Sequence, residues 1–280
     1  MITVFCFTDS FFLQVSSLSR HRGSPRCIAV THSGRFVVTS AWEDGETNVW
    51  SGRGGKCLHV IPTESFSLLT PRSDEDYVIG GDPTTGNIGC WDLETGRQIW
   101  SCAAHADAKE VSCLMWGDKG DLITAGGRVA KLWGVESSVV TLKTEYAGHA
   151  ASITTVAVTA SRDPGLVVTA CKKGEVKIWG YHSGECLKTV SHDEDKVECL
   201  AISGSDQLLA SGTKKGTMSV WSLDKDRVGD QIATTWMGKD SVICALFTKD
   251  ERHVITGLHQ GKQQLFLWDY NSADETKSKR

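Results

Sequence analysis

The chain has 280 residues, of which 40% are hydrophobic and 23% charged, so it can bury a large core in one domain. Its formal net charge of -4 excludes a global basic field of the kind that attracts nucleic acid, and it excludes a strongly acidic protein as well. No uninterrupted apolar run reaches membrane-spanning length, and the apolar start lacks the basic region and cleavage site of a signal peptide, so we expect a soluble protein.

The first nineteen residues contain two apolar segments but not a complete repeat. We predict a partial blade here, in which the segment from Phe11 to Ser17 could complete the last repeat of the chain by closing a ring, because closure removes exposed strand edges. The remainder, Met1 to Phe7, suggests that the chain is the last part of a longer repeat array or a shortened gene product.

From His21 onwards the chain repeats a pattern of four short apolar segments with period-two alternation, separated by turns rich in Gly, Asp, Asn or Lys. This pattern predicts antiparallel strands rather than helices. The stretch from Gly148 to Val190 is its clearest copy. The third segment of each repeat ends in a tryptophan, and successive tryptophans are 41, 42, 46, 42 and 47 residues apart. These markers are Trp50, Trp91, Trp133, Trp179, Trp221 and Trp268.

With this spacing the chain resembles the WD-repeat family. Trp91-Asp92 and Trp268-Asp269 match the Trp-Asp signature, Gly148-His149 matches the Gly-His that opens a repeat, and the other four repeats keep the Trp alone. The resemblance implies an all-β fold, a β-propeller of WD-type four-stranded antiparallel blades with six recognisable repeats and an N-terminal partial blade. We expect a single propeller domain over residues 1–269, a disordered polar tail over 270–280, and a monomeric ring. A narrower resemblance is to the C-terminal array of a NACHT and WD-repeat protein.

Repeat one contains the residues of the family's hydrogen-bond network, namely His21, Ser40, Asp44 and Trp50. The resemblance makes this set structural, because buried polar groups need partners, and a buried serine without an oxyanion site is no nucleophile. We therefore predict no catalytic residues and no enzyme. In repeats four and five, Lys173 and Lys215 stand at the place of the Asp, so we expect the network to be degenerate in every repeat but the first.

Candidate partner-binding residues lie on predicted turns. Two Lys-Lys-Gly turns occupy equivalent places in repeats four and five, so four ammonium groups should share one face that could bind an acidic ligand. The acidic run at residues 193–195 falls on the same face. The alternative is therefore that these acidic residues neutralise the lysines and that the face binds no ligand. Large aromatic side chains near turns could be partner anchors or local packing. The candidates are Trp42, Trp236, Lys172, Lys173, Lys214 and Lys215.

The cysteines recur at equivalent repeat positions, which indicates that they fill the core as reduced thiols. Cys27, Cys113, Cys199 and Cys244 share one place in the first segments of their repeats. The chain has no C-x-x-C pair, so the sequence predicts no metal site, and nothing in it indicates a cofactor. Reduced thiols favour the cytoplasm, with the nucleus as an alternative.

The predicted function is a non-catalytic protein-interaction scaffold, either within a multiprotein complex or as the regulatory sensor array of a larger protein. The partners would be other proteins, without a strong nucleic-acid signal and without a transmembrane segment. One alternative is a substrate receptor of a ubiquitin ligase, although Trp91-Asp92-Leu93-Glu94 lacks the Arg that such receptors often carry. Another is a propeller that binds acidic ligands or phosphoinositides.

Overall fold

The computed structural model spans the whole chain, and in the described part the regular structure is β-strand apart from the 3₁₀ residue Gly120. Strands β1, β2 and β7 are described by their backbone alone. The described residues are 2–8, 11–18, 20–22, 25–31, 33–41, 45–62, 68–71, 77–82, 84–108, 110–117, 120–136, 139–161, 163, 165–259 and 265–271.

The chain forms two compact units. The first comprises Met1–Trp116 and Val135–Thr141, and the second comprises Gly117–Gly134 and Leu142–Arg280. The first unit begins with a two-stranded antiparallel sheet, where the sequence predicts a partial blade, and continues with the four-stranded sheets of repeats one and two. Its strands are β1 (Ile2–Thr8), β2 (Phe11–Leu18), β3 (Pro25–Val30), β4 (Phe36–Ala41), β5 (Glu46–Ser51), β6 (Cys57–Pro62), β7 (Leu68–Pro71), β8 (Tyr77–Gly81), β9 (Asn87–Asp92) and β10 (Gln98–Ala103).

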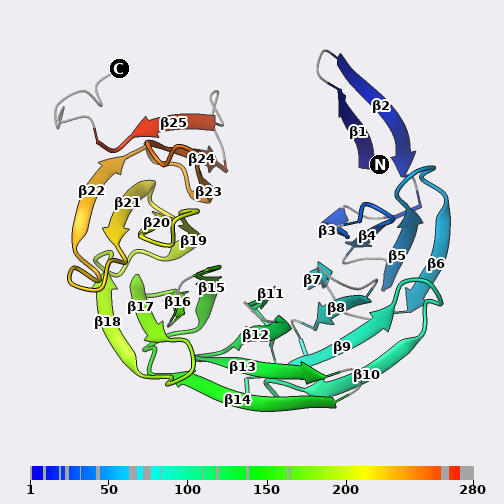
Figure 1. Cartoon of the computed structure of the whole chain (residues 1–280), viewed down its shortest axis with the longest axis horizontal. Helices are drawn as coiled ribbons and strands as arrows, with labels where there is room; N and C mark the ends of the chain where they lie inside the picture. Colours follow the sequence, from blue (N-terminus) through cyan, green and yellow to red (C-terminus); the bar gives the residue numbers. More distant parts are fainter. Residues whose placement is uncertain are drawn as a thin grey trace. The chain divides into compact units, whose positions relative to one another are not determined.

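The division between the compact units falls within repeat three, and repeats four to six belong to the second unit. Repeats four and five are four-stranded sheets, and repeat six has three strands (Figure 1). The strands are β11 (Cys113–Trp116), β12 (Asp121–Gly126), β13 (Val129–Glu136), β14 (Val139–Ala147), β15 (Ile153–Val158), β16 (Leu166–Cys171), β17 (Glu175–Gly180), β18 (Cys186–Ser191), β19 (Val197–Ile202), β20 (Leu208–Thr213), β21 (Thr217–Ser222), β22 (Gln231–Trp236), β23 (Val242–Phe247), β24 (His253–Leu258) and β25 (Leu265–Asp269).

Each sheet is an antiparallel meander in sequence order, and each marker tryptophan lies on the third strand. The predictions of antiparallel strands and of a tryptophan on the third strand of each repeat are therefore confirmed. In repeat four the sequences of the strands match their places in the sheet. Strand β16 reads Leu-Val-Val-Thr-Ala-Cys and is buried at every position, as expected for a central strand covered on both faces. The sequence of β18, Cys-Leu-Lys-Thr-Val-Ser, is exposed at five of six positions, as expected for an outer strand.

Neighbouring sheets of the second compact unit pack against each other through apolar clusters. The first strands of repeats four, five and six are β15, β19 and β23, and β19 lies between the other two. One cluster joins repeat four to repeat five and includes Val176, Ile178 and Trp221. A second joins repeat five to repeat six and includes Met218, Val242 and Tyr270. Burying each such side chain contributes about 1.5 to 3 kcal/mol, so these clusters hold the three sheets in fixed relative positions.

The two Lys-Lys-Gly turns have the same backbone conformation. Gly174 and Gly216 have φ angles of +80° and +88°, a region that other residues rarely adopt. Their N–H groups donate to the carbonyls of Cys171 and Thr213, each at 3.2 Å. The glycines therefore fix both turns in one shape, and each turn presents its lysines at the same end of its sheet.

Candidate functional site

A chain of hydrogen bonds, His to hydroxyl to Trp, lies inside repeat one. His21 Nε2 is 2.7 Å from Thr39 Oγ1, and Trp50 Nε1 donates to the same oxygen at 2.8 Å. The sequence assigned this place to Ser40, which is wrong: its hydroxyl is buried and has no hydrogen-bond partner in the described part of the chain. Successive side chains of a strand point to opposite faces, so only Thr39 reaches the tryptophan. Asp44 lies outside the described residues.

Repeats four and five contain the same arrangement, so for the histidine, hydroxyl and tryptophan of these two repeats the expected degeneracy is wrong. Each has a buried histidine, a hydroxyl on the second strand, and the marker tryptophan. The histidine-to-oxygen distances are 2.6 Å for His149 to Thr169 and 2.8 Å for His192 to Ser211, and the tryptophan-to-oxygen distances are 2.8 Å for Trp179 and 2.7 Å for Trp221. We call each such set of three residues the His-hydroxyl-Trp frame.

Repeat four supplies a carboxylate to its frame from an unexpected position. Lys173 does stand in the turn, but Glu175, two residues further along, places its carboxylate 3.4 Å from His149 Nδ1 and accepts the Ala150 N–H at 3.1 Å. That N–H lowers the pKa of Glu175. Burial, together with the Lys177 ammonium, lowers the pKa of His149 to about 4 against the opposing effect of Glu175, so the imidazole is neutral at pH 7.

The predicted lysines line a hollow in the second compact unit, which we call the basic hollow. It encloses about 490 Å³ and is formed by the β16–β17 and β20–β21 turns together with the loops that follow β18 and β22. Three consecutive repeats thus contribute to one concave surface. Its lining residues are Lys172, Glu194, Asp195, Lys196, Lys214, Lys215 and Lys239.

The lysines of the basic hollow are mostly not neutralised by direct ion pairs. Asp195 is buried and accepts the backbone N–H of Lys215 at 3.1 Å, so its carboxylate holds the turn in place. Lys196 pairs with Glu198 at 2.8 Å. Among the described residues no ion pair involves the other four ammonium groups, those of Lys172, Lys214, Lys215 and Lys239. The hollow therefore carries a net positive charge.

Trp236 lies beside the basic hollow. Its side chain is 53% exposed, and its Nε1 donates to the carbonyl of Lys215 at 3.2 Å. It lines a second hollow of about 450 Å³, whose wall includes Asp195 and Lys215 of the basic hollow. An exposed indole, oriented by a backbone hydrogen bond, is thus placed next to a cluster of ammonium groups.

The structure brings together most of the candidate partner-binding residues. Lys172, Lys214 and Lys215 share the basic hollow, whereas Lys173 is exposed on the same turn but does not line it. Trp42 lies outside the described residues. The sequence missed Lys196 and Lys239. The signal that could have found Lys239 is its place after Gly238, which corresponds to that of His149 after Gly148.

Comparison with known proteins agrees with this geometry. The model of the family "WD domain, G-beta repeat" matches residues 12–51, 140–180 and 184–222. The chain contains WD repeats at these positions. The match at 184–222 begins within repeat four and ends within repeat five, so the family pattern includes the two repeats that keep the frame in the second compact unit. Members of this family typically serve as protein-interaction scaffolds and are generally non-catalytic.

The curated relatives of this WD-repeat chain are diverse. It is 22% identical over 192 residues to autophagy-related protein 16 of Arabidopsis thaliana, which covers 68% of the chain and 37% of that protein. It is 29% identical over 256 residues to WD repeat and SOCS box-containing protein 1 of Danio rerio, which covers 85% of the chain and 50% of that protein. It is 23% identical over 220 residues to human WD repeat-containing protein 90, which covers 73% of the chain and 12% of that protein. The chain thus spans at most half the length of these three relatives.

The described residues include no helix that could span a membrane. The nine cysteines whose side chains the structure describes form no disulfide with one another.

Proposed function

We propose that this WD-repeat chain is a non-catalytic scaffold, and that its basic hollow docks an acidic segment of a partner protein. It would act within a multiprotein complex or as a regulatory array of a larger protein. The link to a NACHT and WD-repeat protein, the role as a ubiquitin-ligase substrate receptor and phosphoinositide binding stay predictions. The cytoplasmic location and the single ring of residues 1–269 with a polar tail also stay predictions.

The observation that supports this proposal most is the charge of the basic hollow. Five lysines and two acidic residues line it, and one of those acids is buried against the backbone. Like charges on a concave surface focus the electrostatic potential and raise the local concentration of an oppositely charged ligand. An acidic partner segment would replace the missing counter-charges of Lys172, Lys214 and Lys239.

The surroundings of the basic hollow favour a protein over a nucleic acid or a membrane. The positive charge is confined to one hollow on a chain of net charge -4, whereas nucleic-acid sites usually present an extended basic surface. Trp236 offers an aromatic anchor of the kind that is common in the centre of protein interfaces. A partner segment with an acidic stretch and a neighbouring apolar side chain fits both features.

The test is the affinity of the chain for a fluorescent glutamate-rich peptide, measured by anisotropy at two salt concentrations. The double variant Lys214→Glu/Lys215→Glu should bind at least about tenfold more weakly, a change of ~1.4 kcal/mol, because it inverts two charges of the hollow. Lys173→Glu is the control, since it inverts one charge on the equivalent turn of repeat four but outside the hollow, and it should stay within about twofold.

Equal losses in the double variant and in Lys173→Glu would contradict docking in the hollow, because the effect would then come from net charge alone. Vesicles of phosphatidylcholine with and without a phosphoinositide provide the second arm of the test. Flotation that depends on the phosphoinositide, without any peptide binding, would contradict a protein ligand and support the lipid alternative.

A further inference from the structure

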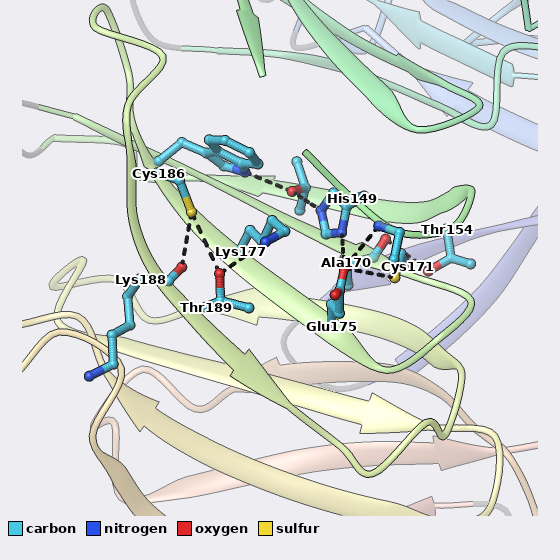
Figure 2. Close-up of polar contacts among 12 residues, drawn as sticks. His149, Thr154, Ala170, Cys171, Glu175, Lys177, Cys186, Lys188 and Thr189 are labelled. Carbon is cyan, nitrogen blue, oxygen red and sulfur yellow. Dashed lines mark hydrogen bonds and ion pairs between the residues drawn. The ribbon is translucent and has the colours of Figure 1, made fainter. Parts of the chain in front are cut away.

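Three potential metal ligands meet inside repeat four, beside the Lys-Lys-Gly turn that also contributes Lys172 to the basic hollow. They are His149, just before β15, Cys171, the last residue of β16, and Glu175, the first residue of β17. Their ligand atoms all lie within 4.8 Å of one another. Figure 2 shows the three side chains converging on one point, each from a different segment of the repeat.

His149 presents one ring nitrogen to this point. Its side chain is 0% exposed, and its Nε2 is bound to Thr169 in the His-hydroxyl-Trp frame. Its Nδ1 is buried without a hydrogen bond and lies 3.4 Å from Glu175 Oε2. When Nε2–H donates to Thr169, the lone pair of Nδ1 is free for an ion. A metal-binding histidine is typically oriented by a hydrogen bond of its other nitrogen in this way.

The other two ligands are positioned by the Lys-Lys-Gly turn. Cys171 is fully buried, and its Sγ is 3.9 Å from Glu175 Oε2 across the turn. The Glu175 carboxylate is held in place by the Ala150 N–H, from which it accepts a hydrogen bond. Sulfur, nitrogen and a carboxylate oxygen therefore lie within 4.8 Å of one another, the first two on buried residues and the third on a partly exposed one.

We propose that His149 Nδ1, Cys171 Sγ and the Glu175 carboxylate bind one zinc ion, with water as the fourth ligand. Zinc accepts mixed nitrogen, sulfur and oxygen ligands in tetrahedral geometry, whereas calcium and magnesium require oxygen. Bond lengths of about 2.0 to 2.3 Å place tetrahedral ligand atoms roughly 3.3 to 3.8 Å apart. Two of the three separations, 3.4 Å and 3.9 Å, are close to this range, and the third, from His149 Nδ1 to Cys171 Sγ, is no more than 4.8 Å. On binding, the Cys171 thiol releases its proton to solvent, one per ion.

Repeat five has the same frame but lacks two of the three proposed zinc ligands. Its frame contains His192, but the places of Cys171 and Glu175 are taken by Thr213 and Thr217. There Thr213 Oγ1 accepts the backbone N–H of Thr217 at 3.0 Å, which satisfies the turn locally. The cluster is thus not a requirement of the shared frame, because repeat five folds the same way without it.

The experiment is a titration of the full chain with Co²⁺, which reports both tetrahedral geometry and thiolate ligation by absorbance. Zn²⁺ is then added to displace it, and native mass spectrometry counts the ions. We expect one ion per chain and a thiolate-to-cobalt band that disappears in Cys171→Ser. Cys186→Ser removes an exposed thiol of the same repeat and serves as the control, which should keep the band.

Glu175→Gln provides a second variant that retains the size of the side chain and should weaken Zn²⁺ binding at least about tenfold. Circular dichroism identifies the folded variants, and only these are compared. The proposal is overturned if the folded wild-type chain binds no ion, or if the cobalt band persists in Cys171→Ser. It is also overturned if Cys186→Ser loses the band, because the ion would then be an adventitious one on an exposed thiol.

Discussion

Repeats four and five place a histidine, a hydroxyl and a tryptophan at matching positions with nearly equal hydrogen-bond distances. The turns between their second and third strands nevertheless carry different side chains. Repeat four has Cys171 and Glu175 where repeat five has Thr213 and Thr217. The same two turns also differ from each other in their contribution to the basic hollow, to which repeat five gives two lysines and repeat four gives one. These two repeats thus share their buried frame, whereas the residues of their turns differ and could serve different functions.

The largest expected effect concerns the marker tryptophans of these two repeats. Trp179 and Trp221 are 2% and 5% exposed, and each donates to the hydroxyl of its frame. Trp179→Ala and Trp221→Ala should each lower the free energy of unfolding by about 3 to 5 kcal/mol, because both leave a large cavity. Urea denaturation followed by circular dichroism measures this. A large loss in one repeat and almost none in the other would show that the frames are not equivalent.

A smaller effect is expected when the hydroxyl of the frame is removed. Thr169→Val and Ser211→Ala each leave a buried imidazole and a buried indole N–H without their shared partner, which costs about 1 to 3 kcal/mol. Ser40→Ala in repeat one is the control and should change stability by less than about 0.5 kcal/mol, because its hydroxyl has no described partner. If Ser40→Ala costs as much as Thr39→Val, the assignment of Thr39 to the frame is wrong.

The smallest predicted effect on stability is a dependence on pH in repeat five. Burial lowers the pKa of His192 below its ordinary value of 6.5, although Asp195 and Asp193 oppose this. The unfolded chain therefore takes up a proton near pH 6.5 while the folded chain does not, so the free energy of unfolding falls as the pH drops below about 6.5. Denaturation midpoints between pH 7.5 and 5 should fall less steeply in His192→Gln. An unchanged slope in that variant would contradict a buried neutral His192.

The repeat architecture could be predicted from the sequence because two independent patterns coincide. The tryptophan spacing sets the length of a repeat, and the period-two alternation sets its strands. The register within a strand could not be predicted in the same way. Thr39 and Ser40 are adjacent and both carry hydroxyls, so composition does not distinguish the residue that faces Trp50 from the one that faces the other side.

The parts of the site that the sequence missed depend on contacts between segments that are distant in the chain. Lys196 and Lys239 join the basic hollow because loops of successive repeats end at the same place, which no single repeat reveals. Glu175 reaches His149 because its side chain is long enough to take the role of an Asp two positions earlier. A ligand set drawn from three segments has no C-x-x-C spacing, so the sequence alone predicts no metal site.

The most direct test of a common frame with exchangeable turns is to transfer the ligands of repeat four to repeat five. The double variant Thr213→Cys/Thr217→Glu places a thiol and a carboxylate beside His192, in the geometry that Cys171 and Glu175 have beside His149. Native mass spectrometry of the folded variant with excess Zn²⁺ should count two ions per chain instead of one, and adding Cys171→Ser should return the count to one. A count that stays at one in the folded double variant would contradict the account.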